Sequence, residues 1–429
     1  MTGSSARRSP WTSPRDRVIA VAIALGVATT GMVVWATSDS VGTESTVART
    51  PARPLDTPSR VPNSFTELWR APSAATPVPV AQGSTVVTGD SGEVIGRDPL
   101  SGFQRWRYAR DTPLCTVAGE WSKAIAVFTK GNGCSEVTAL DADTGRRAAQ
   151  RNGDAEAGTQ LLSDGSHLVT TGTRLINVWS QELLRAMEFG ELPAPVNPGK
   201  QPRAGCEFSS IAIAHGKIGT VARCPGEAAA RLIVFTTTHY EKDESRSDEP
   251  KELYSAALPS GPARVVAISG PEPEDAGPED AESEDRAVTA VALAEQKLLL
   301  VYGPDGKRST AFSLDLPEQE LAGAPAGGAV LTSHTETGVY WFTGSRTIAL
   351  AGADLRPRWT LRDTIGTTTE FGGRLLVPIT GGLAVVDEQS GETLRTVAVD
   401  RGGYAGPVRL ASVGPVLLEQ RGDLLVALR

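Results

Sequence analysis

The amino-acid sequence predicts an all-β fold, a β-propeller with eight blades (seven being the alternative count), preceded by one membrane-spanning helix. Three observations predict it. A turn motif recurs along the chain at the spacing of a propeller blade, many short apolar runs are separated by Gly, Asp and Thr, and one early strand has no neighbour along the chain. Helical periodicity is confined to the N-terminus.

The first element is an uncharged apolar segment at residues 18–36 (VIAVAIALGVATTGMVVWA). Its length is close to the roughly 20 residues that cross a bilayer as a helix, so it predicts a transmembrane signal anchor. Four arginines lie in the preceding tail, residues 1–17, which by the positive-inside rule stays in the cytoplasm while the rest of the chain lies outside. A signal peptide cleaved after Ala36 is the alternative, although its apolar core would be unusually long.

Residues 37–64 are rich in Ser, Thr and Pro and predict a flexible-to-extended tether between the membrane and a domain at residues 65–429. The formal net charge of the chain is −8, and residues 37–429 alone carry 38 basic and 49 acidic residues, a balance of −11. Phosphate binding needs clustered Lys and Arg, and the sequence has no such cluster. We therefore expect no binding to nucleic acid.

The repeat is clearest in three segments that align without gaps: 94–106 (VIGRDPLSGFQRW), 137–149 (VTALDADTGRRAA) and 383–395 (LAVVDEQSGETLR). Each has a strand-like run followed by Asp and, four residues later, Gly. An Asp can cap a tight turn through its carboxylate, and a Gly supplies the positive φ at which the chain reverses. The turn residues are therefore Asp98 and Gly102, Asp141 and Gly145, and Asp387 and Gly391.

Five weaker copies bring the count to eight. Three of them place Ala351, Tyr302 and Trp179 at the Asp position, and the Tyr302 copy has Gly306 at the Gly position; the other two are strands at 232–236 and 424–429. The last copy lacks a fourth strand, and the orphan strand 65–70 (FTELWR) supplies one if it pairs with the C-terminal strands. Such pairing closes the ring and removes exposed sheet edges. Trp69, Trp106 and Trp359 align in this frame, and we expect them to stack between blades.

The segments ALDADTG, VVDEQSG and GRDPLSG…W resemble the PQQ-like repeat of quinoprotein-type β-propellers, and the resemblance covers roughly residues 65–429. Within that superfamily the chain is similar in kind to the non-catalytic scaffold lipoprotein of outer-membrane protein assembly. The dehydrogenases of the superfamily carry a vicinal Cys-Cys disulfide, a Trp stacked on the cofactor and a catalytic Asp beside calcium, and no matching set exists here. The resemblance therefore implies no enzyme, no cofactor, and no catalytic, cofactor-binding or metal-binding residues.

Four cysteines in an exported chain predict disulfides, for which three pairings are possible. The repeat frame favours Cys115–Cys134 and Cys206–Cys224, because each pair joins the start of a blade's first strand to the region between its second and third strands. Zinc would need closer Cys pairs. The four histidines share no spacing, so we expect no metal site unless they converge at the axis; they are His167, His215, His239 and His334.

The most consistent function is that of a membrane-anchored, extracytoplasmic scaffold that binds a protein partner. The alternatives are a ligand-sensing propeller and, less in keeping with the motifs, an enzyme with its site in the central funnel. Two acidic insertions, 241–252 and 271–285, should emerge on one face of the ring, opposite the disulfides. There they would attract a basic partner, or serve only as solvating loops.

Overall fold

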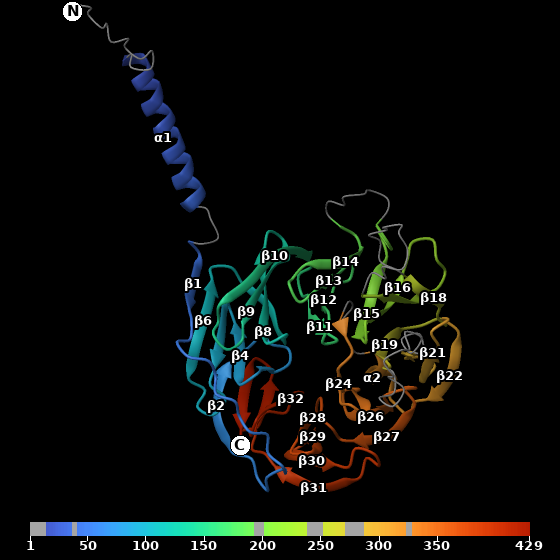
Figure 1. Cartoon of the computed structure of the whole chain (residues 1–429). Coiled ribbons are helices and arrows are strands. Elements are labelled where there is room, and N and C mark those ends of the chain that lie inside the picture. The colour runs from blue at the N-terminus through green and yellow to red at the C-terminus, as the bar shows by residue number, and fades with distance from the viewer. Residues whose placement is uncertain (1–13, 37–40, 193–200, 238–251, 271–286, 323–327) are drawn as a thin grey trace, which may run out of the picture.

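The computed structural model describes residues 14–36, 41–192, 201–237, 252–270, 287–322 and 328–429. Helix α1 (Pro14–Ala36) contains the predicted apolar segment and buries none of its residues. It is the one described helix that is long and apolar enough to cross a membrane. Eight antiparallel sheets form the rest of the molecule and surround a common axis (Figure 1).

The first four blades take their strands in chain order from the axis outward. They contain β3 (Val80–Gln82), β4 (Thr85–Asp90), β5 (Glu93–Arg97) and β6 (Gln104–Arg110); β7 (Leu114–Glu120), β8 (Lys123–Lys130), β9 (Gly133–Asp141) and β10 (Arg147–Ala155); β11 (Leu161–Ser163), β12 (Leu168–Thr170), β13 (Leu175–Trp179) and β14 (Arg185–Gly190); and β15 (Glu207–Ala214), β16 (Lys217–Arg223), β17 (Arg231–Thr236) and β18 (Glu252–Ala257).

The next four blades follow the same order. They contain β19 (Ala263–Ile268), β20 (Thr289–Leu293), β21 (Leu298–Tyr302) and β22 (Arg308–Ser313); β24 (Thr332–His334), β25 (Gly338–Phe342), β26 (Arg346–Ala351) and β27 (Pro357–Arg362); β28 (Thr369–Phe371), β29 (Arg374–Ile379), β30 (Gly382–Val386) and β31 (Thr393–Ala398); and β32 (Val408–Val413), β33 (Val416–Arg421) and β34 (Leu424–Leu428), with β2 (Glu67–Pro72) as the outermost strand. The predicted count of eight blades is confirmed.

Strand β2 closes the ring by pairing antiparallel with β34, with Trp69 opposite Ala427 and Ala71 opposite Leu425. Just before the strand, Thr66 and Arg429 exchange two backbone hydrogen bonds of 2.8 and 2.9 Å. The first residues of the domain and the last residue of the chain therefore belong to one sheet. The predicted pairing of the orphan strand is confirmed.

The Asp–Gly motif forms the turn between the third and fourth strands of a blade. In its three clear copies the Asp carboxylate accepts a hydrogen bond from the backbone N–H three residues on, at 2.8–2.9 Å, and the Gly has φ of +71° to +75°. Each Gly also donates its N–H to the carbonyl of its Asp, at 2.8–2.9 Å. The motif thus reverses the chain as its residue types predict.

The aligned tryptophans dock each blade onto the motif of the next one. The indole of Trp106 lies against Gly145, and its Nε1–H donates to the carbonyl of Ala142 at 2.7 Å. Trp69 and Trp359 make the same contacts in the following blade, with Pro99 at 2.8 Å and Glu388 at 3.0 Å as acceptors. A Cβ on Gly145 would lie 2.6 Å from the indole ring, so only Gly leaves room for the docked Trp.

In two weaker copies the large and the small side chain of this contact exchange places. Leu183 and Leu355 occupy the Gly position, have φ of +54° and +55°, and are fully buried. In the preceding blades the Trp position holds Ala149 and Thr310, since the sheet register aligns them with Trp106. The turn therefore supplies the large side chain where the preceding strand offers a small one. Positive φ costs a Leu roughly 1–2 kcal/mol, which burial of its side chain offsets.

In the third and fifth blades the predicted frame is one residue out. The turns begin at Ser180 and Gly303, whose N–H groups donate to the carbonyls of Leu184 and Lys307 at 2.9 and 2.8 Å. Ser180 and Gly303, and not Trp179 and Tyr302, therefore take the Asp position. A turn shorter by one residue causes the shift. Gly306 does receive an aromatic ring from the preceding blade, which is that of Tyr254.

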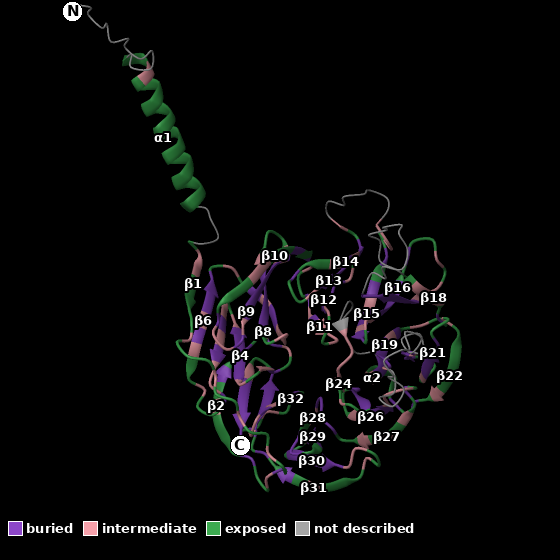
Figure 2. Cartoon of the chain, in the orientation of Figure 1, coloured by how far each residue is buried: buried purple, intermediate pink, exposed green. Residues whose placement is uncertain are grey.

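Burial follows the sheet architecture. The middle strands β13, β20, β25 and β30 are buried at every residue, whereas outer strands such as β22 and β27 are largely exposed (Figure 2). Each blade packs between two neighbours, so both faces of its middle strands are apolar and few polar positions are left along them.

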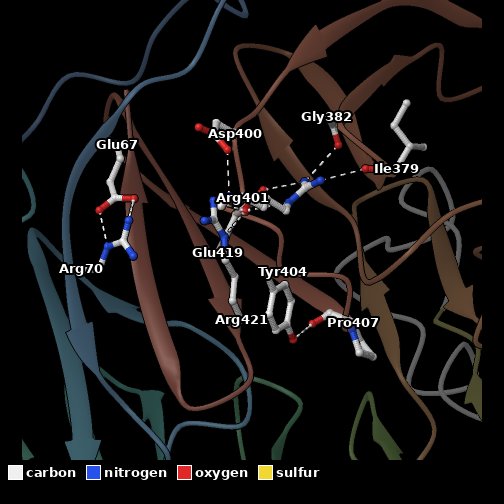
Figure 3. A network of polar contacts seen from close by, with 11 residues as sticks. Glu67, Arg70, Ile379, Gly382, Asp400, Arg401, Tyr404, Pro407, Glu419 and Arg421 are labelled. Carbon is white, nitrogen blue, oxygen red and sulfur yellow. Dashed lines mark hydrogen bonds and ion pairs between the residues drawn. The ribbon is translucent and has the colours of Figure 1, made fainter.

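A buried ion network joins blade 7 to blade 8 beside the closing strand (Figure 3). Glu419 is fully buried and contacts the guanidinium groups of Arg401 and Arg421 at 2.8 and 2.7 Å. Arg401 also donates to the carbonyls of Ile379 and Gly382 in blade 7. One buried carboxylate holds two buried guanidinium groups, and this demands one geometry, because removing the carboxylate would leave two buried cations without their ion pair.

Residues 41–65 pack against the propeller, unlike the flexible tether that their composition suggested. Strand β1 (Thr43–Thr46) adds a fifth strand to the outer edge of blade 1, antiparallel to β6. The next residues, which we call the strap (residues 47–65), cross blades 8 and 7 before the chain turns into β2. Along the strap, Leu55 lies against Gly414, Val61 accepts a hydrogen bond from Arg395 at 2.6 Å, and the ring of Phe65 packs against that of Phe371.

The two predicted disulfides, Cys115–Cys134 and Cys206–Cys224, are confirmed. Both lie where first strands begin and second strands end, and we call this side of the ring the disulfide face. The opposite side carries the turns after the first and third strands. The acidic insertions are joined to it between β17 and β18 and between β19 and β20, and we call it the insertion face. Most of both insertions lies outside the described residues.

We expect Gly145→Ala to destabilise the protein by about 3 kcal/mol, through positive φ (about 1 kcal/mol) and the clash with the Trp106 ring (about 2 kcal/mol). Gly131→Ala is the matched control, because Gly131 has φ of +62° and no atom within 4 Å of an added Cβ. Urea unfolding of both variants measures the difference. Equal losses would show that docking of the Trp does not hold neighbouring blades together.

Candidate functional site in the central channel

The innermost strands of the eight blades line a channel along the axis, and a cavity of about 320 Å³ remains inside it. The cavity is bounded by β11, β15, β19, β24 and β32, together with the segments that precede β3 and β28. Most of its wall is apolar, and Leu161, Ile213, Val266, Leu331 and Leu410 are representative. Its volume is at the lower end of the range for ligand pockets.

A short strand of the chain itself enters this channel. Strand β23 (Gly328–Ala329) pairs in parallel with the inner edge of β15, with Gly328 opposite Ser210 and Ala329 opposite Ile211 (Figure 1). The strand belongs to the connection between blades 5 and 6, which also contains α2 (Glu318–Ala322). Among the described residues, β15 is the one innermost strand whose inner edge pairs with another strand, and the inner edge of β32 makes a single parallel bridge between Val408 and Gly366.

Polar side chains interrupt the apolar wall. Gln160 accepts a hydrogen bond from the backbone N–H of Ala329 at 3.2 Å, and the hydroxyls of Ser333 and Thr368 lie 2.5 Å apart. Arg409 donates to the carbonyl of Pro77, and burial lowers the pKa of its guanidinium. Because Arg409 lies near the start of β32 and His334 at the end of β24, the polar groups flank the apolar wall at both ends.

His334 lines the cavity, and its side chain is exposed to the channel space. Desolvation, with a smaller contribution from His215, lowers the pKa of His334 to about 4. Burial also lowers the pKa of His215, against the opposing effect of Asp164. Both imidazoles are therefore neutral at pH 7 and present a donor and an acceptor, not a charge.

The two histidines are the part of the predicted set that approaches the axis. His167 lies in the turn before β12, and His239 lies outside the described residues. The described ranges contain no group of three or more His, Cys, Asp or Glu side chains that could hold a metal ion. The disulfides and turn motifs lie away from the cavity, so these sequence-predicted residues have structural roles. The channel residues Gln160 and Arg409 carry no repeat signal that could have identified them.

A second depression, of about 660 Å³, lies on blade 1 beside β1. Three of its charged groups pair with one another: Arg107 contacts Glu44 at 2.7 Å and also Glu93, and these carboxylates raise the pKa of Arg107. Since these charges are already compensated, the channel is the better candidate for a binding site.

The direction of β1 shows at which face of the ring the chain enters the propeller after α1. Thr43 pairs with Arg110, which ends β6 at the disulfide face, so the chain enters the propeller on that side. Six residues separate Ala36 of α1 from Thr43, and the seven extended steps between the two Cα atoms span at most about 25 Å. The end of α1 must therefore lie within that reach of the disulfide face of blade 1.

Eight blades around a common axis define the class: the chain is an eight-bladed β-propeller, and three of its blades carry an Asp–Gly turn that receives an aromatic ring. More specifically, residues 27–184 match the family model of outer membrane protein assembly factor BamB. No curated protein sequence matches the chain.

Solved structures share the architecture at low sequence identity. The computationally designed Ika8 protein has 13% identity and a TM-score of 0.52, covering 84% of this chain and 98% of its own. Sqt1 of Saccharomyces cerevisiae has 10% identity and a TM-score of 0.52, covering 86% and 98%. BamB from Moraxella catarrhalis has 12% identity over 90% and 96%, with a TM-score of 0.36 that supports no detailed comparison. At such identities the likeness concerns the fold alone.

The lowered pKa of His334 predicts a pH dependence of stability. Between about pH 6.5 and pH 4 the unfolded chain binds a proton at this residue and the folded protein does not, so stability falls as pH is lowered through this window. Urea midpoints measured from pH 7 to pH 4 should fall less steeply for His334→Gln than for the wild type. Parallel profiles would show that the imidazole is not desolvated in the channel.

Proposed function

We propose that this protein is an extracytoplasmic scaffold, held at the membrane by α1, which binds a protein partner through the propeller. The observation that carries the proposal is the match of residues 27–184 to the BamB family model, on a chain that forms the whole propeller. That family is named for outer membrane protein assembly, which supports a role in protein binding and not in chemistry on a small substrate.

The anchor and the compartment have independent support. No residue of α1 is buried, unlike those of a core helix of a soluble domain, and its charge-free stretch fits the apolar bilayer interior. Two disulfides are typical of an oxidising compartment outside the cytoplasm. The reach from α1 to Thr43 then favours a disulfide face directed toward the membrane and an insertion face directed away from it.

This orientation favours the insertion face as the surface offered to a partner. The face carries the turns of all blades after their first and third strands, as well as the attachment points of both acidic insertions. An acidic surface held away from anionic headgroups avoids repulsion and attracts a basic partner.

Two exposed residues at opposite ends of β9 provide a test. Asn132 precedes the strand at the disulfide face, and Arg146 follows it at the insertion face, about 30 Å away for a nine-residue strand. A photo-reactive amino acid is introduced at either position in the full-length protein in native membranes. We expect cross-links to lipid from position 132 and to a discrete protein from position 146, because the anchor holds the disulfide face at the bilayer.

A reporter that is active only outside the cytoplasm, fused after Arg429, serves as the control for topology and should be active in the membrane fraction. A soluble product would contradict the anchor. Lipid cross-links from position 146 alone would reverse the orientation, and the absence of any protein adduct at either position would contradict the scaffold.

A further inference from the structure

We propose that the central channel is a binding site for an extended peptide, which adds a strand to the inner edge of β15, and that residues 328–331 of the chain occupy this site when no peptide is bound. The proposal rests on the scaffold function and adds to it a second, internal surface with a defined kind of ligand. It concerns the channel and is independent of which face is directed toward the membrane.

The first argument is the pairing itself. The edge of a strand presents unpaired N–H and C=O groups that accept any extended chain, because recognition uses backbone hydrogen bonds. On β15 this edge is already in use, since Gly328 and Ala329 lie opposite Ser210 and Ile211. The structure therefore contains an example of the proposed complex, with an internal segment in the place of the ligand.

The second argument is that a side chain of another blade forms a hydrogen bond with the backbone of the inserted strand. The Oε1 atom of Gln160, which precedes β11 in blade 3, accepts the N–H of Ala329 at 3.2 Å. The backbone N–H of Gln160 is itself held by the hydroxyl of Thr171 at 2.9 Å. With the backbone of Gln160 held at this point, its side-chain amide accepts a hydrogen bond from the backbone of the inserted strand. This contact does not depend on the identity of the side chain that the strand carries there.

The third argument is space beside the inserted strand. The remaining cavity of about 320 Å³ adjoins Ala329, Val330 and Leu331, and its wall is apolar next to them. Val330 packs against the buried cluster that contains Val266 of β19. The site therefore favours small residues where the peptide lies against β15 and an aliphatic residue directly after them.

The internal segment is a weak occupant, because its pairing spans two residues only. A covalently linked segment nevertheless competes at an effective concentration on the order of millimolar. The apparent affinity for a peptide supplied from outside is therefore the intrinsic affinity multiplied by the fraction of molecules in which the site is open. Weakening the internal pairing should raise the measured affinity without any change to the binding surface.

The experiment uses the full-length protein in detergent and a fluorescent, end-capped peptide with the sequence of residues 328–333, Gly-Ala-Val-Leu-Thr-Ser. Ala329→Pro removes the N–H that Gln160 accepts and so weakens the hold of the channel on the internal segment. We expect this variant to bind the peptide at least tenfold more tightly than the wild type, measured by fluorescence anisotropy. Val330→Ser, which leaves every backbone group in place, should raise the affinity severalfold and provides the test if Ala329→Pro does not fold.

Two matched controls address the mechanism. The same peptide N-methylated at its Ala lacks the donor for Gln160 and should lose the gain in affinity, as should Gln160→Leu combined with Ala329→Pro. Equal binding of the peptide by wild type and both folded variants would overturn the proposal and leave residues 328–331 as a permanent part of the channel. Equal binding of the methylated peptide would overturn the role of Gln160. Neither result depends on cross-links from positions 132 and 146, so a failure here is distinct from a failure of the scaffold function.

Discussion

The closed ring depends on one piece of sheet in which the start of the domain meets the end of the chain. Thr66 and Arg429 exchange backbone hydrogen bonds, and β2 completes a blade that β34 would otherwise leave with an open edge. Because every blade is held by its two neighbours, an open seam would leave two blades with one neighbour each and expose apolar sheet faces to water. The buried cluster of Arg401, Glu419 and Arg421 lies at the same seam and joins blade 7 to blade 8.

Sequence reasoning was sufficient where the repeat carries a physical signature. Asp141 and Gly145 mark a turn because the carboxylate caps it and the Gly accepts positive φ, and Trp69 marked the closing strand by alignment with Trp106. Sequence reasoning was insufficient where side-chain packing between blades takes the place of the Asp–Gly motif. Leu355 stands where a Gly was expected because the preceding strand supplies a small residue, and no single segment of sequence contains that information.

The channel residues were hidden for a related reason. Innermost strands such as β11 and β24 span three residues each, too few for a period to appear, and Gln160 and Arg409 act through partners distant in the sequence. Strands β1 and β23 add to edges of blades to which they are not adjacent in the repeat, so a repeat frame could not place them. In both cases the chain covers an exposed edge with its own connecting segments, and such edges are where a propeller without a catalytic motif can bind extended chains.

Hydrogen–deuterium exchange of Ala71→Pro most directly tests the claim that the seam between β2 and β34 holds the ring. Ala71 pairs with Leu425, and Pro cannot keep an extended ladder at that position. The account predicts faster exchange of backbone amides in β34 and also in the flanking blades, β3–β6 and β28–β31, with blade 4 changed much less. Faster exchange confined to the immediate neighbours of residue 71, with blades 1 and 7 as protected as in the wild type, would contradict it.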